Sequence, residues 1–266
     1  MKKIVLLLFV FALFTSCEDV VEIDLNTSDP KLVIEASVNL LEDGTSNSTV
    51  KLTLTAPFFD NQIPTVDDAS VIITGDNGLV FPFNYTNNGT YESSLVPQAG
   101  INYTLEVIYM GETYSATEQL VAVSSLEFVE QNNDGGFSGE DIELKVFFTD
   151  PVGLGDHYFF EGISERGIEL DALVDEFFDG NQIFGFYSVD DLVAGDVVKF
   201  NLYGVNDQFY NFMFILLQQG SDQGGGPFET QPATVRGNII NETNSDNFPL
   251  GYFRVSEVST LIYTVQ

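Results

Sequence analysis

The chain has 266 residues, of which 44% are hydrophobic, so it can fold as one large β domain or as two smaller ones, each with a buried core. It carries 9 basic against 40 acidic residues, a formal net charge of −31, which disfavours nucleic acid and anionic lipid headgroups as partners. Because it has one cysteine, an internal disulfide and a four-cysteine zinc site are both excluded.

Residues 1–16 have the pattern of a secretory signal peptide. Lys2 and Lys3 provide a positive start, and residues 4–14 form an unbroken apolar run. As a helix this run would span about 16 Å, which is too short to cross a bilayer. We therefore expect a signal peptidase to remove residues 1–16.

The residues around the expected cleavage point resemble a lipobox. Phe14, Thr15 and Ser16 precede Cys17, with Phe14 standing where leucine is commoner. A thiol is needed at that point because a diacylglyceryl group is attached as a thioether, and the small residues give lipoprotein signal peptidase access to the bond. The alternative is an ordinary signal peptide with an incidental cysteine. We predict lipidation of Cys17, whose palmitate-type chains would hold the protein on a bilayer.

Residues 17–30 form an acidic tether behind the predicted anchor. The stretch 18–24 resembles the signal that moves Bacteroidota-type lipoproteins to the outer face of the outer membrane. The alternative is a solvated tether without a sorting role. In that case the sequence does not distinguish the periplasmic face of the membrane from the external one. We expect an outer-membrane protein that faces the cell surface.

Residues 31–124 predict short strands joined by tight turns. Residues 50–55 alternate in polarity with period two, as a half-buried strand does. Glycine-containing turns at 75–78, 87–89 and 110–111 favour hairpins. Such a series of strands suits a small β-sandwich.

Tyr103 refines this prediction. It lies near the start of a predicted strand, 102–107, and follows the loop 97–101. The pattern resembles the tyrosine corner of immunoglobulin-like sandwiches, in which the Tyr hydroxyl bonds back to the preceding loop. The alternative is an isolated Tyr in a strand. We predict an immunoglobulin-like sandwich over residues 31–124.

Residues 125–266 predict a second, β-rich domain with one or two short helices. The polar run 131–136 is expected to be a loop near the boundary. Apolar residues at helical spacing predict a short helix over 170–178. The apolar stretch 208–219 lacks β-alternation and predicts one buried helix, too short to span a membrane. Further strands are predicted at 197–202, 250–255 and 260–265.

Several short segments occur in an order that resembles one known family. They are residues 29–35, 100–107, 175–181, Tyr210, 237–239 and 250–253. From about Cys17 to its end, the chain resembles a Bacteroidota lipoprotein family catalogued as domain of unknown function 4249. The resemblance implies an immunoglobulin-like part joined to a larger β-rich part, and genes that tend to lie beside TonB-dependent outer-membrane receptors. It supplies no catalytic residues.

Catalytic patterns are weak in this sequence. Ser164 lies one residue away from the spacing of a nucleophile elbow, and the sole histidine, His157, is more often structural in such a position. Neighbouring carboxylates, which glycoside hydrolysis would need, arise by chance among 40 acidic residues.

Acidic loops make calcium the one candidate metal. Asp150 with Asp156, and Asp175 with Asp179, offer oxygen ligands, although neither pair has EF-hand spacing. The alternative is solvated loop acids. No cofactor is expected other than the lipid on Cys17.

We therefore expect a non-enzymatic surface lipoprotein that binds a ligand or assists a neighbouring TonB-dependent receptor. The bilayer, through the anchor, and that receptor are the expected partners. A surface hydrolase with a carboxylate pair, or a structural or adhesive module, is the alternative.

Overall fold

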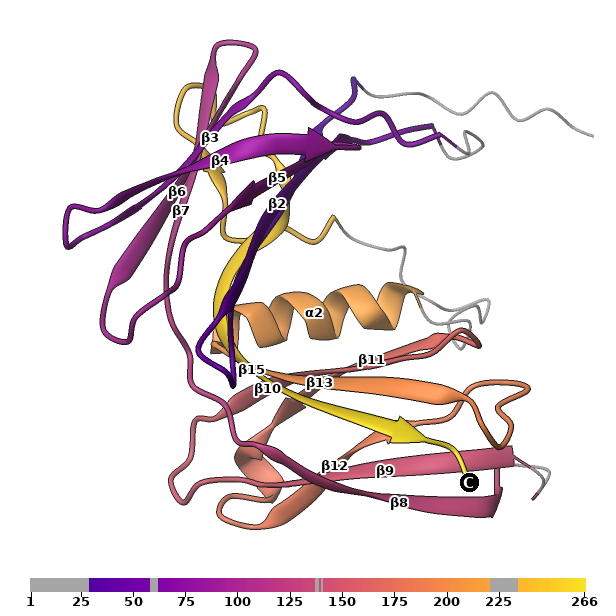
Figure 1. The fold of residues 1–266 in the computed structure, drawn as a ribbon. Coiled ribbons are helices and arrows are strands. Elements are labelled where there is room, and N and C mark those ends of the chain that lie inside the picture. Colours follow the sequence, from indigo (N-terminus) through magenta and orange to yellow (C-terminus); the bar gives the residue numbers. More distant parts are fainter. Residues whose placement is uncertain (1–28, 58–61, 137–138, 140, 221–233) are drawn as a thin grey trace, which may run out of the picture.

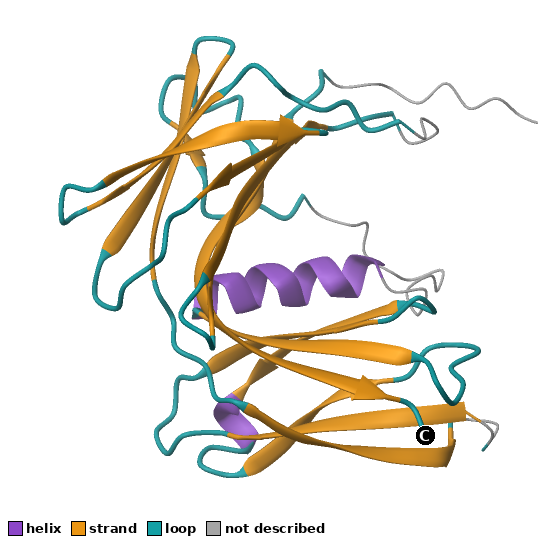
Figure 2. Cartoon of the chain, in the orientation of Figure 1, coloured by secondary structure: helices purple, strands orange, loops and turns teal. Residues whose placement is uncertain are grey.

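A computed structural model describes residues 29–57, 62–136, 139, 141–220 and 234–266. The predicted signal peptide, the lipobox and nearly all of the acidic tether lie outside these ranges. Almost all regular structure in the described part is β, which confirms the predicted class (Figure 2). The elements are β1 (Leu32–Leu41), β2 (Ser46–Leu54), β3 (Ser70–Gly75), β4 (Val80–Asn87), β5 (Thr90–Ser93), β6 (Asn102–Tyr109), β7 (Glu112–Gln119), β8 (Leu126–Gly135), β9 (Asp141–Thr149), β10 (His157–Ile163), β11 (Ile168–Val174), the 3-10 turn η2 (Asp175–Phe177), β12 (Gln182–Tyr187), β13 (Val197–Val205), helix α2 (Asp207–Gly220), β14 (Ile240–Asn241) and β15 (Leu250–Thr264).

Strands β1 to β7 form an immunoglobulin-like sandwich. One layer pairs β1, β2 and β5, and the other pairs β3, β6 and β7. Strand β4 pairs with both β5 and β3, and its register shifts between Tyr85 and Asn87, so it passes from one layer to the other. Alternate residues of both layers meet in one core, for example Ile34, Leu52 and Leu105, each fully buried.

The local signals of this sandwich are confirmed. Asn88 and Gly89, like Met110 and Gly111, have positive φ, as a two-residue hairpin turn requires. Tyr103 is buried, and its hydroxyl accepts the backbone N–H of Gln98 at 2.8 Å. This bond is the predicted tyrosine corner.

The last strand joins the two halves of the molecule (Figure 1). Strand β15 runs parallel to β1 over Leu250–Val258 and antiparallel to β13 over Val258–Thr264. It is one strand of 15 residues, so the prediction of two separate closing strands is wrong. Neighbours on both sides pair its backbone, and the interval 256–259, which includes the buried Val258, contains no residue that breaks a strand.

Residues from beyond position 125 also complete the first core. Strand β14 pairs with β7, and Ile239, Phe253 and Val255 pack among the sandwich residues. The division of the chain into two domains near residue 124 therefore stays a prediction. The two expected parts nevertheless share β15, and in the described chain a single sheet of 12 strands runs through both.

The second half is built around β13, which is buried on both faces. Val198, Phe200 and Leu202 face the small sheet β12-β9-β8. Tyr203 and Val205 face helix α2. Figure 1 accordingly shows α2 lying between the lower half and the strands β1, β2 and β15 of the upper half.

Two sequence predictions in this half are wrong, and a third is confirmed only in part. The helix expected over 170–178 is strand β11 followed by the single turn η2, because the tight turn between Ser164 and Gly167 pairs β11 with β10. The loop expected at 131–136 is mostly the end of β8, paired with β9. Helix α2 is present at Asp207–Gly220, but it is not fully buried.

One face of α2 remains exposed. Phe209 and Met213 are buried against the sheet, whereas Phe214, Ile215 and Leu216 are 44%, 46% and 43% exposed. The helix therefore presents an apolar surface that the described part of the fold does not cover.

Candidate functional site

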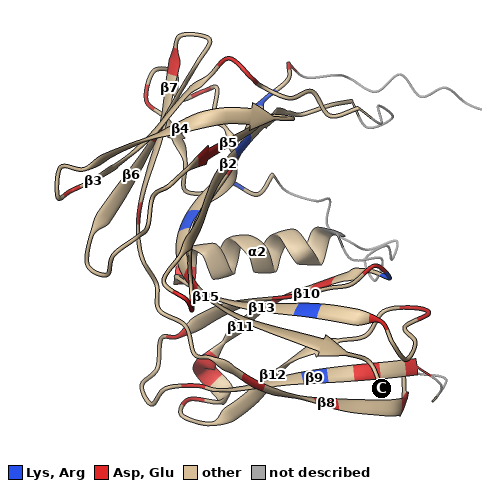
Figure 3. Ribbon diagram, in the orientation of Figure 1, with Lys and Arg blue, Asp and Glu red and all other residues tan. Residues whose placement is uncertain are grey.

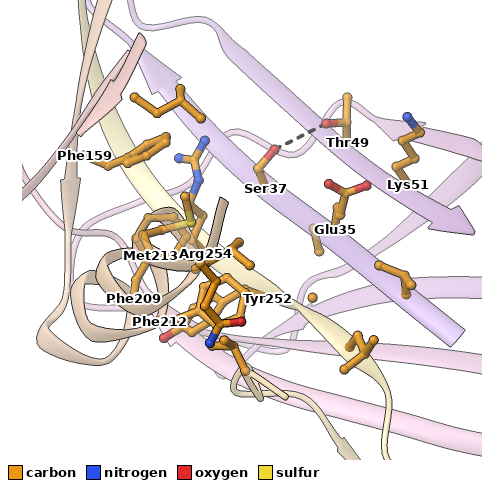
Figure 4. A pocket seen from close by; sticks show the side chains of 18 of the residues that line it. Glu35, Ser37, Thr49, Lys51, Phe159, Phe209, Phe212, Met213, Tyr252 and Arg254 are labelled. Atoms are coloured by element: carbon orange, nitrogen blue, oxygen red, sulfur yellow. Dashed lines mark hydrogen bonds between the residues drawn. The ribbon is translucent and has the colours of Figure 1, made fainter. Parts of the chain in front are cut away.

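A cleft of about 830 Å³ lies between helix α2 and the strands β1, β2 and β15 (Figure 4). This volume is within the range of roughly 300–1,000 Å³ that small-molecule sites occupy. The lining is mainly apolar, with a few charged and hydroxyl side chains. It consists of Val33, Glu35, Ala36, Ser37, Thr49, Lys51, Phe159, Leu170, Phe209, Phe212, Met213, Leu216, Gln219, Thr234, Val235, Leu250, Gly251, Tyr252 and Arg254.

Helix α2 supplies the apolar wall. The helix starts at a capping bond, in which the Asn206 side-chain oxygen accepts the backbone N–H of Phe209 at 2.8 Å. Phe209 and Met213, four residues apart, anchor it to the sheet, and Phe212 and Leu216, also four apart, border the cleft. The spacing of apolar residues thus packs one side of the helix on the sheet, and side chains of that side and of the next one line the cleft.

The sheet supplies a row of polar side chains. Ser37 pairs with Arg254 on β15 and with Thr49 on β2, so the three side chains stand side by side on adjacent strands. The Ser37 and Thr49 hydroxyl oxygens are 3.3 Å apart. Because side chains alternate between faces, the row two residues along also faces the cleft, and it contains Glu35 and Lys51. The cleft therefore has a donor-rich row facing an apolar helix (Figure 4).

Arg254 is held firmly in this row. Its Nη1 donates to Asn39 Oδ1 at 2.8 Å, and its guanidinium carbon lies 4.2 Å from the centre of the Tyr203 ring. The nearby carboxylate of Glu161 is bonded instead by the Tyr203 hydroxyl, at 3.0 Å. Burial lowers the pKa of the guanidinium, which still stays charged. Among the described residues Arg166 forms a salt bridge with Asp196, whereas Arg254 has no carboxylate within salt-bridge distance.

A half-buried glutamate fixes the start of α2. Glu118, on β7, accepts the side-chain amide of Asn206 at 2.8 Å and that of Asn238 at 2.6 Å. The Tyr252 hydroxyl donates to it at 3.4 Å. Burial raises the pKa of the Glu118 carboxyl, and the three donors oppose that rise. Glu118 thus ties the sandwich to the helix cap and to the returning C-terminal segment.

Three of the four aspartates expected as calcium ligands meet at one place, and Asp156 is not part of that group. Asp150, Asp175 and Asp179 each bring a carboxylate oxygen within 4.8 Å of the others. Asp150 accepts the Tyr158 hydroxyl at 2.5 Å and the Gly180 N–H at 2.9 Å. The sequence treated these residues as two separate pairs, and the structure joins them because η2 lies against the loop that follows β9.

The remaining oxygens of this cluster also accept backbone donors. Asp175 bonds the N–H groups of Gly155 and Asp156, at 2.7 and 3.1 Å, and Asp179 bonds that of Gly153 at 2.6 Å. Burial, then the charges of Asp150 and Asp175, raise the pKa of Asp156. The carboxylates therefore hold two loops together, and calcium binding stays a prediction.

His157 and Ser164 do not meet. They flank opposite ends of β10, which separates them by most of a strand. The His157 ring bonds the Gly155 carbonyl and lies 3.6 Å from Asp207. Ser164 accepts the Tyr187 hydroxyl at 2.7 Å within a turn. The structure thus gives this serine no histidine base.

The anchor residues lie outside the described chain. Phe14, Thr15, Ser16 and Cys17 fall in this segment, so their role stays a prediction. No helix in the described ranges is long and apolar enough to cross a membrane.

The sequence did not single out the polar row. Ser37, Thr49 and Arg254 lie far apart in the chain, and none belongs to a motif. The one available signal was Arg254 itself, a rare cation within the predicted strand 250–255.

A family model described as domain of unknown function (DUF4249) matches residues 18–262. The chain belongs to this family. No curated protein matches the sequence. Similar solved structures include a two-domain fibronectin type-III segment of chicken tenascin, 16% identical with a TM-score of 0.22, covering 66% of this chain and 91% of that one. A cytokine receptor complex is 12% identical with a TM-score of 0.24, covering 66% and 84%. These scores are too low to inform function, which must be argued from the site.

Proposed function

We propose that this member of the DUF4249 family is a lipid-anchored protein of the outer-membrane surface, which binds a small ligand in the α2 cleft as an accessory to a TonB-dependent receptor. The observation that carries the proposal is the cleft itself. Its volume and its apolar wall with a few polar groups suit a small-molecule site.

The sequence supports the cellular side of the proposal. The lipobox at Cys17 predicts the anchor, and the acidic stretch behind it predicts export to the surface. The resemblance to Bacteroidota lipoproteins implies a receptor as neighbour.

Binding suits the site better than catalysis does. The converging carboxylates of Asp150, Asp175 and Asp179 already accept N–H or O–H donors, and Ser164 is remote from His157. A hydrolase that uses a carboxylate pair is therefore less favoured.

Purification from outer membranes tests both parts of the proposal. A tagged protein should recover a β-barrel receptor, and native mass spectrometry should detect a bound small molecule. Leu216→Asp should remove that molecule and Phe214→Asp should retain it, because the two side chains are equally exposed but only Leu216 lines the cleft. Equal retention by both variants would contradict a ligand site here, and failure to recover any barrel would contradict the accessory role.

A further inference from the structure

We infer that the ligand of the α2 cleft is a long-chain carboxylate, whose headgroup is bound by Arg254, Ser37 and Thr49 and whose chain lies along α2. The inference rests on the proposed function, because it names the class of ligand for the same cleft. Four observations carry it.

The first observation is the distribution of positive charge. Acidic residues are spread over both halves of the molecule (Figure 3). By contrast, two of the 9 basic residues, Lys51 and Arg254, line the cleft. Arg236 directly follows the lining residue Val235, and both Arg236 and Lys31 lie over the Phe248 ring, at 3.6 and 3.8 Å. In a chain of net charge −31, two cations against the single carboxylate of Glu35 in the lining of one cleft favour an anionic ligand there.

The second observation is the state of Arg254. A largely buried charge is costly unless an opposite charge pairs with it. Asn39 and the Tyr203 ring orient the guanidinium, and Glu161 attracts it from beyond the Tyr203 hydroxyl, but within the described chain Arg254 makes no direct salt bridge. A guanidinium presents parallel donors that match the two oxygens of a carboxylate. The geometry therefore prepares Arg254 for an anionic ligand.

The third observation is the pair of hydroxyls beside it. Ser37 and Thr49 share one hydrogen bond across 3.3 Å, so a second hydroxyl proton remains for a ligand oxygen. Both residues are level with Arg254 on neighbouring strands. Glu35 is only two residues from Ser37 on the same face, and its negative charge favours a singly charged headgroup over a doubly charged phosphate.

The fourth observation is the wall opposite this row. Phe212, Met213 and Leu216 of α2 line the cleft, and Leu170 adds to them from β11. These side chains carry no charge, and the burial of their apolar surface against a hydrocarbon chain would favour binding. A ligand with a carboxylate at one end and a hydrocarbon chain matches both walls.

Isothermal titration calorimetry at pH 7 tests the inference with the chain from Glu18 onward, which contains every described element. The probes are dodecanoate, dodecyl phosphate, dodecyltrimethylammonium and acetate, all below micelle formation. Dodecanoate should bind at least about tenfold more tightly than the other three, the factor expected from one charge-assisted contact.

Variants locate the headgroup. Arg254→Gln and the double change Ser37→Ala with Thr49→Ala should each weaken dodecanoate binding about tenfold. The double variant keeps the Arg254 contacts, so it tests the site even where Arg254→Gln fails to fold. Lys199→Gln removes a lysine of β13 that does not line the cleft and should bind as the wild type does.

The outcomes separate the two proposals. Equal binding of dodecyltrimethylammonium and dodecanoate would overturn the carboxylate inference but leave the ligand site standing. Unchanged dodecanoate affinity in the double variant would also overturn it. Binding of none of the amphiphiles would overturn the inference, while a different small molecule retained after purification would still support the proposed function.

Discussion

Replacing Glu118 with alanine should loosen the junction between the sandwich, the cap of α2 and the C-terminal segment. The variant loses two short bonds, to the amides of Asn206 and Asn238, at 2.8 and 2.6 Å, and a long one to Tyr252. An amide donor left without a partner in a buried site costs about 1–3 kcal/mol. The substitution also removes the desolvation penalty of the half-buried carboxylate, which offsets part of that cost. We expect the free energy of unfolding to fall by about 2 kcal/mol.

Urea denaturation followed by circular dichroism measures this effect. The matched control is Glu106→Ala, which removes an exposed glutamate from the neighbouring strand β6 and should change stability by less than about 0.5 kcal/mol. Glu118→Gln keeps the aliphatic part of the side chain and one acceptor oxygen. Its loss of unfolding free energy should therefore lie between the losses of the other two variants. If Glu118→Ala is no less stable than Glu106→Ala, the proposed role of Glu118 as a tie between segments is refuted.

Three further predictions concern other parts of the chain. Tyr103→Phe removes the bond to Gln98 and should lower the free energy of unfolding by about 1 kcal/mol in the same assay; an unchanged midpoint would mean that the tyrosine corner is not stabilising. Because the pKa of Asp156 is raised in the folded state, its contribution to stability is present below the unfolded pKa of about 4 and is lost as the pH rises through the folded pKa. Asp156→Asn should therefore be more stable than wild type at pH 7, by about 0.5 kcal/mol, and equal to it at pH 3, and thermal melts at both pH values check this. Cys17→Ser should leave the precursor uncleaved and unlabelled by an alkyne-tagged fatty acid, and normal processing would contradict the predicted anchor.

Local chemistry made part of the fold predictable. The positive φ of Gly89 and Gly111 follows from turns that need no distant partner. Tyr103 reaches back only five residues to Gln98. The existence of α2 follows from the length of its apolar run, although the run did not reveal that a side of the helix stays exposed.

Long-range pairing made the rest unpredictable. Strand β11 has helical spacing in its sequence, yet its turn and its partner β10 hold it extended. Three of the four aspartates, from two pairs in the sequence, form one cluster in space, because the bonds of Asp175 to the backbone of Gly155 and Asp156 join two loops that are distant in the chain.

The sequence by itself determined the all-β class, the sandwich turns and the helix, since each depends on residues close together in the chain. The anchor at Cys17 also rests on a local pattern and stays a prediction. Only the tertiary structure decided where a ligand could bind. Ser37, Thr49 and Arg254 become neighbours because β15 returns to lie parallel to β1, and the register of that pairing is set by the packing of two cores. No local pattern in the chain encodes such a register, because it depends on which faces the whole sheet buries.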